Sequence, residues 1–180
     1  MTAPSRPRDD LLVSVALSSP PSNAASIAAL SALAKALDTR FRYWEILVGY
    51  DAERDILPDT LQICIPNLRL LQLRAGSGLY QRRFAVASEA IGDVVLLSTE
   101  AELAHLDLPT MIETADAHQT LVIGQHSDTN LIGSLATAMG RGAGLTIGPQ
   151  DMLTSAFPRP LLGIVLAHPD RLLALRFPPL

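Results

Sequence analysis

Residues Arg83–Glu100 read RFAVASEAIGDVVLLSTE, and they combine a predicted helix, a predicted strand and a polar exit from that strand. Its first half has the apolar spacing of a helix, and Gly92-Asp93 ends that pattern. The apolar run 94–97 predicts a short buried strand, and the polar triplet Ser98-Thr99-Glu100 follows it. Ligands of open α/β sheets bind outside the carboxyl ends of the strands. The triplet is therefore placed to hold a metal ion or another ligand through Glu100.

A second strand is predicted to end in the same way. The short apolar run Trp44–Val48 is followed by Gly49-Tyr50-Asp51. Two strands that each deliver a carboxylate at their exit predict one shared cleft, lined by Asp51 and Glu100.

The rest of the chain alternates predicted strands with predicted helices. Strands are expected at 11–17, 43–48, 68–73, 94–97, 120–123 and, at an edge, 145–147. Helices are expected from a cap at Ser22 or Asn23 to Leu37, and at 58–65, 80–91, 109–117, 130–139 and 158–167, with a helical turn from Asp170. This alternation predicts a mostly parallel sheet in a three-layer α/β/α sandwich. We expect a disordered lead at 1–10 and a single domain at 11–176.

Composition narrows the classes of function. The chain has 180 residues, a formal net charge of −4 and no basic run, which argues against general nucleic-acid binding. It has one cysteine, Cys64, so no internal disulfide is expected and a reducing, cytoplasmic setting fits best. The apolar runs are too short to span a bilayer, so we expect membrane contact to be peripheral at most. The apolar-rich second half, 121–180, suggests a homodimer face.

Common catalytic signatures are missing from the sequence. There is no G-x-S-x-G elbow, no Walker-type lysine loop and no G-x-G-x-x-G after the first predicted strand. The four histidines show no metal-ligand spacing: His105, His118, His126 and His168. A serine hydrolase and a histidine-based metal centre are thereby disfavoured.

The order of the remaining motifs resembles that of the family 2 glycosyltransferases, which have the GT-A fold. That family has a V-S-V strand, an E-I-L-V strand, a glycine- and basic-rich segment, and an A-x-G-D motif followed by an apolar strand. The matching residues, over about 11–125, are Val13-Ser14-Val15, Glu45-Ile46-Leu47-Val48, Gly76-Ser77-Gly78, Arg83 and Gly92-Asp93 with Val94–Leu97. Further on, Val122–His126 and Asp151–Arg159 resemble motifs of the polyprenyl-phosphate branch.

The resemblance implies roles for particular residues. Asp51 would contact the nucleotide base, Arg83 would lie near the diphosphate, and Glu100 would hold a Mg²⁺ or Mn²⁺ ion. Ser18 and Ser98 would complete the nucleotide-binding set, while Asp151 and Arg159 would line the acceptor side. The implied function is the binding of a nucleotide-diphosphate sugar and the transfer of its sugar to an acceptor, in glycan or polysaccharide assembly.

The departures from the family pattern leave alternatives open. The family's D-D-G-S is Tyr50–Glu53 here, its D-x-D is Ser98–Glu100, and the turn after the first strand carries no acid. The catalytic base has no clear counterpart. A catalytically inactive relative that binds a nucleotide or a protein would explain these departures as well. A third hypothesis is a different nucleotide-binding α/β domain.

Local roles also account for the candidate residues. Asp51 can cap a turn, Glu100 can belong to a solvated loop or helix start, and Arg83 can be a helix-surface cation. Asp151 can cap a helix, and Arg159 can be a surface charge. The sequence alone does not choose between these roles and the functional ones.

Overall fold

The computed structural model describes residues 7–57, 61, 65–125 and 151–176 of the chain. In this part of the chain, six strands form one sheet in the order β3-β2-β1-β4-β6-β5. Their bounds are β1 Arg8–Leu17, β2 Phe41–Asp51, β3 Leu68–Leu73, β4 Val94–Ser98, β5 Val122–Gln125 and β6 Asp151–Pro158. The first four strands are parallel, and β6 runs antiparallel to both of its neighbours.

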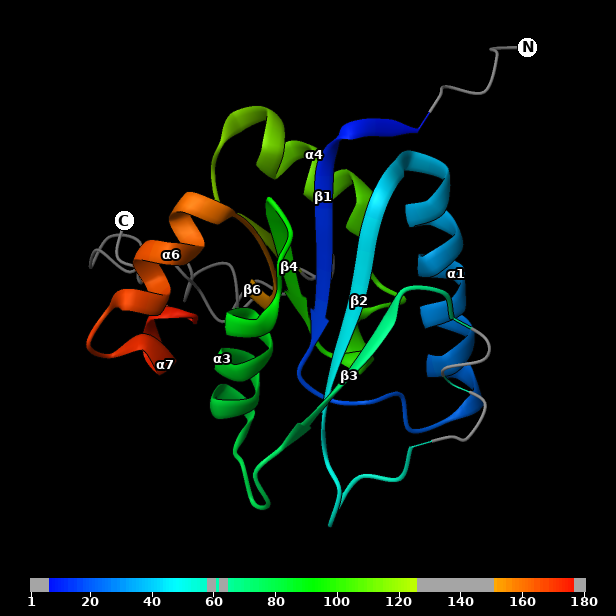
Figure 1. The fold of residues 1–180 in the computed structure, drawn as a ribbon, viewed down its shortest axis with the longest axis vertical. Coiled ribbons are helices and arrows are strands. Elements are labelled where there is room, and N and C mark those ends of the chain that lie inside the picture. Colours follow the sequence, from blue (N-terminus) through cyan, green and yellow to red (C-terminus); the bar gives the residue numbers. More distant parts are fainter. Residues whose placement is uncertain (1–6, 58–60, 62–64, 126–150, 177–180) are drawn as a thin grey trace, which may run out of the picture.

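Helices cover both faces of this sheet (Figure 1). One face carries α1 (Ala24–Arg40) and α4 (Leu108–His118), whose buried side chains form one apolar cluster with the strands. The other face carries α3 (Leu79–Glu89), α6 (Arg159–Ala167) and α7 (Arg171–Ala174), which share a second cluster. A 3₁₀ turn, η1 (Glu100–Glu102), follows β4. The predicted three-layer sandwich with a mostly parallel sheet is confirmed.

Because both faces are covered, the central strands are buried on both sides and are mostly apolar, with Ser14 and Glu45 as buried polar exceptions. Ile46 and Val48 of β2 pack into the cluster on the α1 face, while Leu47 between them packs into the opposite cluster. The predicted cap of the first helix is also confirmed, since the Asn23 side chain accepts a hydrogen bond of 2.9 Å from the Ser26 N–H.

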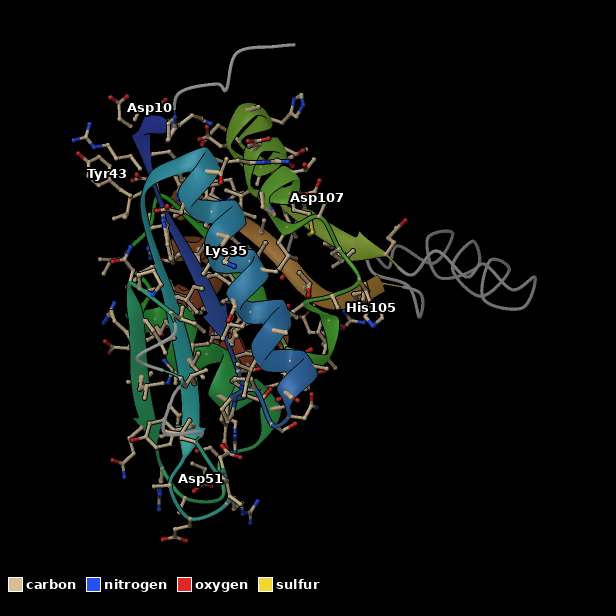
Figure 2. All side chains as sticks on the ribbon, turned by 90° about the vertical axis from the view of Figure 1, so that its right-hand side faces the viewer. Asp10, Lys35, Tyr43, Asp51, His105 and Asp107 are labelled. Atoms are coloured by element: carbon tan, nitrogen blue, oxygen red, sulfur yellow. The ribbon has the colours of Figure 1, made fainter. Side chains whose placement is uncertain are left out.

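Parallel pairing places the carboxyl ends of β1 to β4 at one edge of the sheet. Figure 2 shows Asp51 at this end of the molecule and Asp10 and Tyr43 at the other. We call the end that holds Asp51 the carboxyl edge.

The strand β6 was not predicted. Its polar pair, Thr154 and Ser155, interrupts the apolar pattern, yet both side chains are buried. Thr154 is satisfied by Glu102 and Ser98, at 2.6 and 2.7 Å, and these partners lie about fifty residues away in sequence. The helix and edge strand expected at 130–139 and 145–147, and most of the helix expected at 58–65, lie outside the described residues.

Gly92 lies where α3 returns to β4, and it is packed directly against β1. A Cβ added there would lie 2.5 Å from the Ser14 backbone nitrogen and 2.9 Å from the Leu12 carbonyl oxygen. Backbone in a central strand cannot shift cheaply. We expect Gly92→Ala to lower the free energy of unfolding by about 3 kcal/mol, at the upper end of overpacking costs.

Urea denaturation of the purified variants checks this prediction. The control is Gly163→Ala on α6, where an added Cβ meets nothing within 4 Å, so we expect a gain of about 0.5–1 kcal/mol. Equal stability of Gly92→Ala and the parent protein would contradict the close packing of this turn.

Candidate functional site

Asp51 ends β2 at the carboxyl edge, and its carboxylate is fully buried. One carboxylate oxygen accepts the Gly76 N–H at 2.8 Å, and the other accepts the Glu53 N–H at 3.0 Å. These hydrogen bonds, the one from Gly76 first, lower the pKa of Asp51 below its usual value. Gly76 has a φ of +76°, which favours glycine. Asp51 therefore holds the loop between β3 and α3 in place as a carboxylate.

Arg82 lies beside Asp51, a contact that sequence reasoning missed. Its guanidinium is 3.8 Å from the Asp51 carboxylate and 2.6 Å from that of Asp55. Consecutive residues of a helix point about 100° apart, so Arg82 and Arg83 face different neighbours. The signal that could have revealed this was the adjacency of the two arginines on a predicted helix.

Arg83 points instead toward β6 and is 1% exposed. Its Nη2 donates to Ser155 Oγ at 3.4 Å, while Nε and Nη1 have no hydrogen-bond partner among the residues that the structure describes. Burial lowers the pKa of Arg83 to about 10, and the nearby Glu102 carboxylate opposes that shift. The side chain is therefore charged at neutral pH. A buried charge without full pairing costs several kcal/mol, so this guanidinium favours an additional anionic or acceptor group.

Glu102, also missed from the sequence, is the acidic residue that binds β6. Its two oxygens accept the Leu153 N–H at 2.9 Å, the Thr154 N–H at 2.7 Å and the Thr154 hydroxyl at 2.6 Å. The only signal in the sequence was a second glutamate two residues after Glu100. Its role depends on the antiparallel strand β6, which was itself not predicted.

Glu100, Ser98 and Ser18 lie at the ends of β4 and β1. The Ser22 hydroxyl donates to the Glu100 carboxylate, which joins η1 to the segment between β1 and α1. The Ser18 N–H donates to the Ser98 carbonyl at 3.3 Å, and both serines are fully buried. The Ser98 hydroxyl contacts Thr154 Oγ1 at 2.7 Å. These contacts link β1, β4 and β6 to one another at the carboxyl edge.

The structure brings only part of the predicted site together. Ser18, Ser98 and Glu100 gather where β1 and β4 end, but Asp51 belongs to β2, and β1 lies between β2 and β4. A strand spacing of about 4.8 Å separates the ends of β2 and β4 by roughly 10 Å. Asp51 is bonded to the β3–α3 loop, whereas Glu100 is bonded to Ser22. The two carboxylates share an edge and are held by different segments.

The two residues predicted for the acceptor side are not brought together. Asp151 begins β6 and Arg159 follows its last residue, so a strand rise of about 3.3 Å per residue separates them by roughly 25 Å. The Arg159 guanidinium donates to the carbonyl oxygens of Gly92 at 2.8 Å and Ala90 at 2.7 Å. The Arg159 side chain therefore lies at the carboxyl-terminal end of α3, at the edge of the sheet opposite Asp51.

The described residues do not fit a self-sufficient divalent-metal site. Mg²⁺ and Mn²⁺ favour oxygen ligands, often one or two carboxylates together with substrate phosphates. No group of three His, Cys, Asp or Glu side chains that could hold a metal occurs within the described ranges. Glu100 supplies one carboxylate, already bonded to Ser22, and Glu102 is saturated by β6. Of the several oxygen ligands that the expected Mg²⁺ or Mn²⁺ ion would need, Glu100 therefore supplies one.

Comparisons with known proteins support the fold. No family model and no curated protein matches the chain. Among solved structures, glucosyl-3-phosphoglycerate synthase of M. tuberculosis matches with a TM-score of 0.52 and 14% identity over 84% of this chain and 58% of that one. A mannosyltransferase of Pyrobaculum calidifontis, solved with GDP-Man and Mn²⁺, matches with a TM-score of 0.56 and 17% identity over 90% and 48%.

A third match belongs to a different class of enzyme. The 2-C-methyl-D-erythritol 4-phosphate cytidylyltransferase of Thermus thermophilus has a TM-score of 0.55 and 14% identity over 93% of this chain and 86% of that one. This chain spans about half the length of the two sugar-transferring relatives. At such identities the likeness establishes the fold, which is of the GT-A type. In the described part of the chain, no helix combines the length and hydrophobicity that crossing a bilayer requires.

Proposed function

We propose that this chain binds a nucleoside-diphosphate sugar at the carboxyl edge of its sheet and transfers the sugar to an acceptor. The observation that carries the proposal is the buried guanidinium of Arg83, whose Nε and Nη1 have no hydrogen-bond partner in the described ranges. An arginine presents its N–H groups in a planar fork that matches phosphate oxygens. The fold adds support, because sugar- and nucleotidyl-transferring enzymes share it.

In this proposal each residue has a role that follows from its contacts. Arg83 binds the diphosphate once the side chains that cover it move, because it is 1% exposed. Ser18 and Ser98 shape the adjacent edge, and Asp51 positions the glycine-containing loop on the base side. Asp151, at the start of β6, stays on the acceptor side of the proposal. Arg159 has no part in it, because its contacts lie at the opposite edge.

A second candidate is a relative that binds the nucleotide and does not transfer a sugar. This second candidate is favoured because the carboxylates at the edge already accept hydrogen bonds within the protein. Asp51 and Glu102 both accept hydrogen bonds from backbone N–H groups, so neither is available as a general base without local rearrangement. Glu100 is bonded to the Ser22 hydroxyl.

Thermal unfolding with UDP, GDP or CDP tests the binding that both candidates share. A ligand at 100 times its Kd stabilises the folded state by about 2.7 kcal/mol, which for a chain of this size raises Tm by roughly 5–10 °C. The matched controls are uridine, guanosine and cytidine, which lack the diphosphate. If no diphosphate shifts Tm more than its nucleoside, with or without Mn²⁺, nucleotide binding is refuted.

Release of nucleoside diphosphate from UDP-glucose and GDP-mannose separates the two candidates. A transferase without its acceptor is expected to hydrolyse the donor slowly, with water in the place of the acceptor. A binding-only relative is expected to shift Tm with the donor and to release no product above the rate of a heat-inactivated sample.

A further inference from the structure

The acidic groups at the carboxyl edge are already bound within the protein. Glu102 accepts three hydrogen bonds from β6, and Asp51 accepts one each from Gly76 and Glu53. Glu100 accepts a hydrogen bond from the Ser22 hydroxyl. A hard divalent cation needs several oxygen ligands at once. To gather them here, a metal would have to displace hydrogen bonds that hold β6 and the loops in place.

A positive charge is nevertheless present at this edge. Arg83 lies on α3, and its guanidinium is close enough to Glu102 for attraction and to Arg176 for repulsion. Within the described part of the chain, its Nη2 donates to Ser155 Oγ at 3.4 Å, and its Nε and Nη1 have no hydrogen-bond partner. A cation held away from water interacts more strongly with an anion than a solvated one does.

We propose that Arg83 supplies the positive charge that offsets the diphosphate, so that this chain binds its nucleotide without a divalent metal. The inference rests on the proposed function, since it concerns the same ligand and the same edge. It departs from the mannosyltransferase of the same fold that was solved with Mn²⁺ bound. The donor set accounts for the departure: the carboxylates at this edge already accept hydrogen bonds, whereas two nitrogens of the Arg83 guanidinium have no hydrogen-bond partner among the described residues.

The experiment is isothermal titration of UDP, GDP and CDP into the intact chain, in EDTA, in Mg²⁺ and in Mn²⁺. We expect the Kd of the tightest diphosphate to agree across the three conditions within about threefold, which is less than 0.7 kcal/mol. Arg83→Met is expected to weaken binding about tenfold or more in EDTA, because hydrogen bonds to a charged group are lost. Glu100→Gln is expected to leave the Kd within about threefold of the parent value.

Arg40→Met is the charge-matched control. Arg40 ends α1 and pairs with Glu113 at 3.3 Å, on the opposite edge of the sheet, so its loss removes one positive charge without touching the site. Its Kd is expected to match that of the parent. Circular dichroism of each variant confirms that it is folded before titration.

The outcomes are distinct. Binding that EDTA weakens about tenfold or more, or that Glu100→Gln abolishes, overturns the inference and leaves the proposed function standing. Metal-free binding that Arg83→Met does not weaken also overturns it, because the charge would then come from another group. Absence of binding in all three conditions removes the proposed function and the inference together.

Discussion

Replacing Arg83 by Met is expected to stabilise the protein. The guanidinium is 1% exposed and two of its nitrogens have no hydrogen-bond partner among the described side chains and backbone, so its desolvation is poorly offset. A methionine fills a similar length of the interior without a charge. Exchanging buried ionic groups for apolar ones of similar volume typically raises the free energy of unfolding by about 1–4 kcal/mol, and we expect a gain in that range from chemical denaturation.

The contacts around Arg83 support this expected gain. Glu102 keeps its three hydrogen bonds from β6 when the arginine is removed, so no carboxylate is left without donors. Ser155 loses one long contact of 3.4 Å. If the variant unfolds more easily than the parent, attraction to Glu102 outweighs the desolvation cost, and Arg83 does not favour an additional anion.

Arg82→Met is the matched control on the same helix. Arg82 pairs with Asp55 at 2.6 Å and lies 3.8 Å from Asp51, so its removal leaves both carboxylates with fewer partners. We expect a loss of about 1 kcal/mol. Both variants remove one positive charge. If Arg83→Met raises the free energy of unfolding and Arg82→Met lowers it, the difference therefore comes from the ion pairing of each arginine.

Glu45→Ala is expected to be strongly destabilising. Glu45 lies in β2 with 7% of its side chain exposed, and it accepts hydrogen bonds from the Ser14 hydroxyl at 2.6 Å and the Ile91 N–H at 3.0 Å. Its second oxygen pairs with Arg69 at 2.6 Å. Truncation leaves the Ser14 hydroxyl and the Ile91 N–H unpaired, at a cost of about 1–3 kcal/mol for each group, whereas the half-exposed Arg69 can be hydrated. Equilibrium denaturation in urea measures the effect.

Surface and isosteric variants serve as controls for Glu45. Glu113→Ala removes a half-exposed partner of Arg40 and is expected to cost less than about 1 kcal/mol. Glu45→Gln keeps an acceptor for Ser14 and Ile91, so its cost is expected to lie between the other two. A Glu45→Ala variant as stable as Glu113→Ala would show that this network contributes little.

The pH dependence of the same network follows from its charges. Burial by itself raises the pKa of Glu45, but the hydrogen bonds from Ser14 and Arg69 prevail and lower it below 4.5. The unfolded chain therefore takes up a proton at higher pH than the folded chain does. The contribution of Glu45 is fully present above pH 4.5 and is lost as the pH falls through the folded value. The difference in stability between the parent and Glu45→Gln should narrow as the pH falls below 4.5.

Much of the layered fold was predictable because its signals are local. The apolar runs at 94–97 and 68–73 became strands β4 and β3 with the expected bounds or within one residue of them. The first helix begins after the predicted cap, Asn23. Helical spacing, caps and short buried runs depend on neighbours a few residues apart, so a single sequence reveals them.

The candidate site was less predictable because its side chains are paired over long distances in sequence. Asp51 was placed correctly at a strand end, yet its partner, Gly76, belongs to a loop 25 residues away. Glu102 and Arg83 acquire their roles from β6, which a buried Thr154-Ser155 pair concealed. Such pairings depend on which strands meet, and periodicity carries no information about that.

By itself the sequence determined the alternation of strands and helices, the caps and the exit points of the strands, because these follow from local spacing and burial on both faces of a sheet. The three-dimensional contacts were needed to show which carboxylates are already hydrogen-bonded, that Arg159 lies at the opposite edge, and that Arg83 is buried without full pairing. The physical reason is that desolvation and hydrogen-bond partners belong to three-dimensional neighbours, which loop closure and strand pairing bring together.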